Sequence, residues 1–147
     1  MTKLSTSTNA AGLDTAKPSK ALHVALWFVQ IVLGVAYVVF GLGKVTQPIA
    51  ALAQQMGWPG AVPEPLVRFI GICEFLGGLG LILPAATRVK PGLTALAGAG
   101  LATLMMLATV FHLSRGEPGM LPVTLISGGL AALVAWGRWK KAPIAAR

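Results

Sequence analysis

The sequence predicts an all-α membrane protein, an antiparallel bundle of four transmembrane helices. Of its 147 residues 55% are hydrophobic and only 11% are charged, a composition far from that of a soluble globular domain. The hydrophobic residues also gather in long runs, and a helix needs about 20 such residues to cross a bilayer core. Four runs qualify, each bounded by proline, glycine or charge, and they define a membrane domain over residues 22–139. The predicted spans are residues 22–43, 66–84, 91–113 and 120–139.

The two ends of the chain differ from the spans. Residues 1–21 are mostly small and polar, so we expect a disordered tail there, and residues 140–147 form a short basic tail. An alternative for the first span is a cleaved signal peptide, because Ala51-Leu52-Ala53 matches a cleavage pattern. We favour a retained span, since the run exceeds the roughly 7 to 15 residues of a signal-peptide core and Lys44 precedes the candidate cleavage site.

Lysine and arginine predict the orientation. Nine lie on the side of both termini and three on the other, so the positive-inside rule places both termini in the cytoplasm, as in a bacterial inner membrane. Trp27, Trp136 and Trp139 then lie near the cytoplasmic headgroups, where indole rings are favoured, and Trp58 lies outside. The nine are Lys3, Lys17, Lys20, Arg88, Lys90, Arg138, Lys140, Lys141 and Arg147, and the three are Lys44, Arg68 and Arg115.

The connections predict how the spans are arranged. Residues 85–90 and 114–119 are short enough to force successive helices into antiparallel contact. The longer connection, residues 45–65, is rich in proline, so we expect it to lie over the outer mouth, with a short helix at residues 48–56. Small residues let membrane helices approach closely, and they mark packing seams in the last three spans. They are Gly71, Gly77, Gly78, Gly80, Ala95, Gly98, Ala99, Ala102, Gly128 and Ala132.

Glu74 is the residue that the bilayer makes hardest to place. An Asp, Lys or Arg at the centre of a membrane helix costs about 2.5 to 3.5 kcal/mol on insertion scales, so an intramembrane carboxylate should face the bundle and find a partner. Its helical neighbours Gly71 and Gly78 admit another helix closely, which points Glu74 inward. A functional role and a structural polar clamp both remain open for it.

Three further ionisable residues should lie in the same outer half of the bundle. Lys44 ends the first span, Arg68 opens the second and His112 ends the third. With Glu74 they form the candidate pocket or polar cluster. Arg68 could bend toward the carboxylate or extend to the headgroups, and His112 could simply meet water or a loop carbonyl. If Glu74 and His112 face a common cavity, they could exchange protons.

Several classes of site are disfavoured. A metal needs three or four ligands, and the outer half offers one histidine, one glutamate and Cys73. Cys73 is the single cysteine, so it has no partner for an intrachain disulfide. The net charge is +8, but the basic residues lie in short segments between apolar runs rather than in one patch. This distribution indicates membrane topology and not nucleic-acid binding. No catalytic residue and no cofactor is assigned.

Three stretches of the sequence resemble the DoxX-like family of small membrane proteins. They are FGLGK at residues 40–44, RFIGICEFLGG at 68–78 and ATVFH at 108–112, in this order, within a resemblance that covers about residues 22–139. The resemblance implies a four-helix membrane fold. Some members of the family are similar to small subunits of quinone-reducing oxidases and others to assembly factors, so the fold does not select an activity.

From these observations we expect a non-catalytic accessory or assembly subunit of a membrane complex, with a membrane or redox protein, or a second copy of the chain, as its partner in the bilayer. The alternative is a quinone- or lipid-binding redox subunit or enzyme in which Glu74 and His112 handle protons. No haem-ligand histidine pair lies inside the spans and no Cys-x-x-Cys occurs, so a partner would have to supply any redox centre. A transporter is less favoured, because no inverted repeat is evident.

Overall fold

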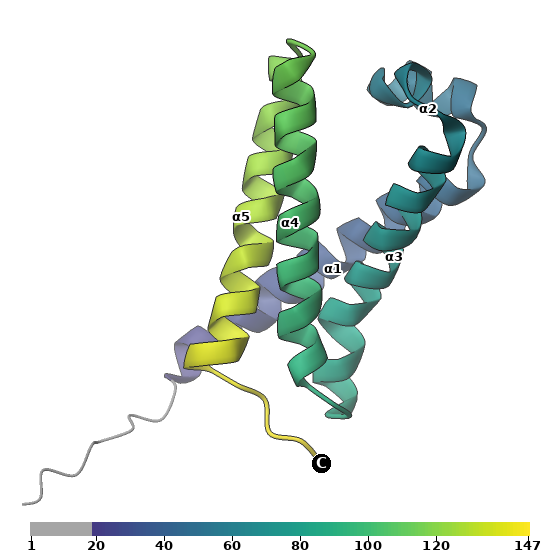
Figure 1. Ribbon diagram of the computed structural model, residues 1–147. Helices are drawn as coiled ribbons and strands as arrows, with labels where there is room; N and C mark the ends of the chain where they lie inside the picture. Colours follow the sequence, from purple (N-terminus) through teal and green to yellow (C-terminus); the bar gives the residue numbers. More distant parts are fainter. Residues whose placement is uncertain (1–18) are drawn as a thin grey trace, which may run out of the picture.

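The computed structural model describes residues 19–147, and these form an all-α bundle (Figure 1). Four of its helices are long and apolar enough to cross a membrane, which confirms the predicted fold class. The long helices are α1 (Lys20–Thr46), α3 (Glu64–Thr87), α4 (Gly92–Ser114) and α5 (Leu121–Trp136), and a short helix α2 (Ile49–Met56) follows α1. Single turns add η1 (Trp58–Ala61) and η2 (Pro118–Met120) in 3-10 form, and η3 (Gly137–Lys141) in π form.

The long helices alternate in direction and form two close pairs, α1 with α3 and α4 with α5 (Figure 1). The pairs are joined chiefly by α3 against α4, and they lean apart toward the end that α2 covers. We call that end of the bundle the capped end. At the opposite end α1 begins and the chain continues beyond η3. We call this the terminal end.

The helices run past several of the predicted boundaries. α1 continues to Thr46, because Lys44 turns into the bundle instead of marking the end of the helix. α3 passes through Pro84 and ends at Thr87, because the next residue, Arg88, has a left-handed φ of 59° that breaks the helix. Pro84 has no N–H to donate to the carbonyl of Gly80, so the helix continues through it with one intrahelical hydrogen bond fewer.

The two predicted tails meet different outcomes. Most of the predicted N-terminal tail, residues 1–18, lies outside the described residues, but α1 already begins at Lys20, with the Ser19 hydroxyl accepting from the N–H of Leu22. At the other end η3 prolongs the fourth span to Lys141, and Ala142 is fully buried. The following residues run along the terminal end, where the N–H of Arg147 donates to the carbonyl of Arg88 at 3.2 Å (Figure 1).

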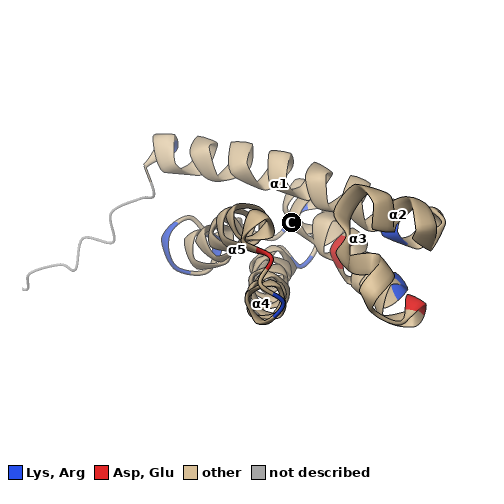
Figure 2. Ribbon diagram, turned by 90° about the horizontal axis from the view of Figure 1, so that it is seen from above, with Lys and Arg blue, Asp and Glu red and all other residues tan. Residues whose placement is uncertain are grey.

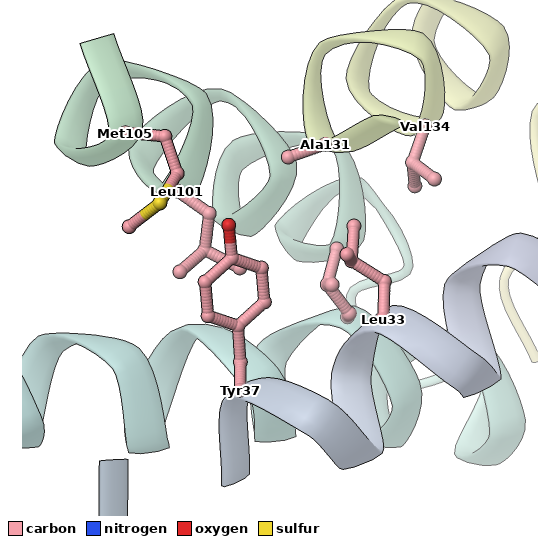
Figure 3. Packing of buried hydrophobic residues seen from close by; sticks show 7 residues of the cluster. Leu33, Tyr37, Leu101, Met105, Ala131 and Val134 are labelled. Atoms are coloured by element: carbon pink, nitrogen blue, oxygen red, sulfur yellow. The ribbon is translucent and has the colours of Figure 1, made fainter. Parts of the chain in front are cut away.

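A buried apolar cluster joins all four long helices at mid-height (Figure 3). Aliphatic side chains from each helix close around the ring of Tyr37, whose hydroxyl points toward α4 (Figure 3). The cluster consists of Leu33, Tyr37, Leu81, Leu101, Met105, Ala131 and Val134.

Glycines set the distance between α1 and α3. Gly34 and Gly41 of α1 face Gly78 and Gly71 of α3, and we call these four residues the glycine seam. A Cβ added at Gly78 would lie 2.6 Å from the carbonyl oxygen of Gly34, and one at Gly41 would lie 2.6 Å from that of Gly71. Only glycine fits at these positions, so the two backbones touch along two helical turns.

Candidate functional site

The capped half of the bundle holds a buried ion pair between the helices of the glycine seam. Lys44 Nζ donates to Glu74 Oε2 at 2.6 Å, and the two side chains are only 7% and 6% exposed. Gly71 makes this possible, since a Cβ there would lie 2.7 Å from the Cβ of Lys44. The seam therefore brings the ammonium of α1 to a carboxylate one turn further along α3, and the structure joins two of the four predicted residues.

Arg68 lies beside this pair but binds other groups. Its Nη1 donates to the backbone carbonyls of Lys44 at 2.6 Å and of Gln47 at 2.7 Å, which are unpaired groups at the end of α1. Its Nε and Nη2 donate to Glu64 Oε1, one turn earlier in α3. Arg68 thus closes the C-terminal end of α1, where a cation is favoured, and it is not the partner of Glu74.

His112 lies apart from these residues, near the turn between α4 and α5. Its Nδ1 lies 2.8 Å from Glu117 Oε2, and Arg115 Nε donates to Glu117 Oε1 at 2.8 Å. The hydrogen bond from His112, and then that from Arg115, hold the pKa of Glu117 below the usual value of a glutamate. Each of the two groups of the predicted proton-exchange pair, Glu74 and His112, thus has a different partner.

A second hydrophobic cluster lies beneath α2 and η1. Leu52, Trp58 and Val67 are buried together, and Phe111 and Met120 pack against them. The Trp58 ring meets the Phe111 ring edge to face, with centroids 6.3 Å apart. Phe111 directly precedes His112, so Trp58 of η1 contacts the same end of α4 that carries the His112–Glu117 pair. The sequence predicts that this connection lies over the outer mouth.

Sequence reasoning missed two features of the polar framework. Glu117 was not singled out, although its position five residues after His112 across a short turn is the signal that could have found it. The second is a polar cluster at the terminal end, built by Arg138 of η3 with His23, Trp27 and Gln30 of α1. The spacing of 23, 27 and 30 places the three polar residues on one helix face, and Gln30 interrupts an apolar run.

Side chains that could coordinate a metal ion do not cluster in the part of the chain that is described. Within residues 19–147, no three His, Cys, Asp or Glu side chains come together as a metal site, and Cys73 is a free, half-buried thiol. The ionisable residues of the capped half form two groups. Lys44 and Arg68, with their partners Glu74 and Glu64, join α1 to α3, and His112 with Arg115 and Glu117 joins the end of α4 to the following turn.

The fold and its buried polar pairs define an integral membrane protein of the four-helix type. In comparisons with known proteins, the model of the DoxX-like family matches residues 28–135, which is most of the chain and includes Lys44, Arg68, Glu74 and His112. The chain belongs to the DoxX-like family. No curated protein and no solved structure matches it.

Proposed function

We propose that this protein is a non-catalytic accessory or assembly subunit of a membrane complex. One observation carries the proposal: the Glu74 carboxylate, which is the candidate for chemistry inside the membrane, is engaged by Lys44 at 2.6 Å between two helices in direct backbone contact. A buried pair of this kind neutralises both charges and fixes the register of α1 against α3. It stabilises a scaffold and leaves no free acid or base at that position.

The other predicted site residues support the same function. Arg68 closes the end of α1, and His112 with Glu117 ties the end of α4 to the turn before α5. A proton-handling site needs its acid and base within reach of one substrate. Here Glu74 already forms an ion pair with Lys44, and His112 already forms a hydrogen bond with Glu117. Their common effect is to hold the capped end together.

The surroundings of such a subunit follow from the helices. Four apolar spans place it in a lipid bilayer. We further propose a bacterial inner membrane with cytoplasmic termini, supported by the cations of the terminal end. In this arrangement the partner, a membrane or redox protein or a second copy of the chain, supplies any redox centre, and the outward-facing apolar side chains of the four helices are the surface available to it.

Native mass spectrometry of the protein, extracted gently from its own membrane, tests the proposal. Wild type is compared with Glu74→Gln, and Glu64→Gln serves as the control, because it removes an exposed carboxylate from the same helix. We expect a copurifying protein in the wild-type complex and no small molecule that depends on Glu74. A bound quinone or other small molecule that disappears in Glu74→Gln but stays in Glu64→Gln would overturn the proposal and establish the alternative of a ligand-binding redox subunit.

A further inference from the structure

The terminal end of the bundle has an excess of positive side-chain charge, and no side-chain carboxylate of the described residues lies there. Its cations are Lys20, Arg88, Lys90, Arg138, Lys140, Lys141 and Arg147. The side-chain carboxylates of residues 19–147 are Glu64, Glu74 and Glu117, all toward the capped end, on α3 and at the turn between α4 and α5 (Figure 2). No side chain of residues 19–147 therefore supplies an anion at the terminal end.

One of these cations is buried. Arg138 is only 4% exposed, and its contacts use part of its five donors. Nε donates to Gln30 Oε1 at 2.9 Å, Nη1 donates to the carbonyl of Ala142 at 3.3 Å, and the guanidinium lies over the Trp27 ring at 5.3 Å. Nη2 is buried with no hydrogen-bond partner in the described structure. All of these acceptors are neutral, so the buried guanidinium has no counter-charge, which is an expensive arrangement.

The contacts of His23 make the shortage of acceptors more severe. Its Nδ1 lies 3.2 Å from Arg138 Nη1, and its Nε2 lies 3.1 Å from the indole nitrogen of Trp27. Guanidinium and indole groups can only donate, and a neutral imidazole accepts at one nitrogen, so His23 can satisfy only one of the two. The cluster of Arg138, His23 and Trp27 thus presents more donors than acceptors, and a group with several negatively charged oxygens would correct this.

The cluster also lies where such a group is available. It is formed by the start of α1 and the end of the fourth span, which is the headgroup level of a spanning bundle. His23 and Trp27 are half-buried, so their side of the cluster is the accessible one. His23 contacts Arg138 Nη1 on this side, so an oxygen that takes the place of His23 would meet the guanidinium at Nη1, next to the unpartnered Nη2.

We infer that Arg138, with His23 and Trp27, forms a binding site for a phosphate group, carried by an anionic phospholipid or present as free phosphate. The planar guanidinium would donate from Nη1 and Nη2 to two phosphate oxygens, the geometry in which arginine binds phosphate best. The Trp27 indole N–H, released from His23, would donate to a further oxygen. The exposed neighbours Lys140 and Lys141 would attract the anion without specifying it.

The test is native mass spectrometry of the full chain released from nanodiscs that contain phosphatidylcholine and phosphatidylglycerol in equal amounts. Wild type is expected to retain one phosphatidylglycerol after phosphatidylcholine has been stripped. Arg138→Lys keeps the charge but loses the planar pair of donors, and we expect about a tenfold loss of retained lipid. Lys140→Gln removes one exposed charge from the same turn, so it measures diffuse attraction alone, and we expect the specific lipid to stay bound.

Two arms distinguish the source of the phosphate. In nanodiscs of phosphatidylcholine alone, inorganic phosphate that raises the melting temperature of wild type, but not that of Arg138→Lys, supports the site and assigns it to the free anion. Retention of phosphatidylglycerol without such an effect supports the site and assigns it to lipid. The inference is wrong if wild type retains both lipids equally and inorganic phosphate has no effect, or if Lys140→Gln loses as much phosphatidylglycerol as Arg138→Lys. If Arg138→Lys does not fold, Trp27→Phe takes its place, because it removes only the indole N–H donor that the site requires; the same loss of phosphatidylglycerol is expected, and undiminished retention would overturn the inference.

Discussion

Breaking the Lys44–Glu74 pair is the sharpest test of the structural role assigned to it. In Glu74→Gln the ammonium of Lys44 stays buried without a carboxylate, and in Lys44→Met the carboxylate of Glu74 stays buried without a cation. The double variant leaves no charge at all. The three proteins thus separate the cost of an uncompensated charge from the net value of the pair.

The magnitude follows from the burial of the two side chains, which are 7% and 6% exposed. Removing one member of a buried pair costs about 3–5 kcal/mol, whereas replacing both with neutral side chains of similar size is often close to neutral. Each single variant should therefore lose about 3 kcal/mol of unfolding free energy, and the double variant should be more stable than either by about 2 kcal/mol.

The assay is equilibrium unfolding in mixed micelles, in which sodium dodecyl sulfate is titrated into a mild detergent and helicity is followed by circular dichroism. Glu64→Gln is the control, because its ion pair with Arg68 has side chains 26% and 59% exposed and should contribute less than about 1 kcal/mol. If the effects of the two single substitutions simply add in the double variant, the charges do not stabilise each other. If Glu74→Gln is as stable as wild type, the carboxylate is not a partner that Lys44 needs, and the reasoning from burial is refuted.

Three further predictions concern packing, capping and pH. Gly78→Leu should prevent α1 and α3 from packing and abolish cooperative unfolding in detergent. The control Gly100→Leu should unfold as wild type, because a Cβ added at Gly100 has nothing within 4 Å, and equal stability of the two variants would contradict the glycine seam. Arg68→Gln should lower unfolding free energy by about 2 kcal/mol, because it frees two backbone carbonyls, and Glu64→Gln should not reproduce this loss. The Glu117 carboxyl has a lower pKa in the folded protein than in the unfolded chain, so its contribution is complete above the unfolded pKa and is lost as the pH falls through the folded one. The melting temperature of wild type should therefore fall more steeply in acid than that of Glu117→Gln, and parallel curves would show that the contact does not stabilise the turn.

The sequence predicts which helices and ionisable residues form the capped end, but it does not predict which of these residues pair with each other. The apolar runs require four helices, and the bilayer penalty requires Glu74 to face the bundle. Four ionisable residues were expected in one half of the molecule, and Lys44 with Glu74 is the pair that forms. The partner of His112 was not foreseen, since a side chain at a helix end can reach any group of the next turn, and only the path of that turn brings Glu117 to it.

By itself the sequence determined the class of protein, the number of its spans and the presence of small-residue seams, because these depend on hydrophobicity and side-chain size summed over many positions. The tertiary structure alone decided which charges meet. Gly34 and Gly41, which no local pattern distinguishes from other glycines, face α3 because the two helices cross there. Arg138 and Gln30 are 108 positions apart in the chain, and only the return of the fourth span to the start of the first brings them into contact. Contacts of this kind depend on helix rotation and crossing, which single-helix periodicity does not encode.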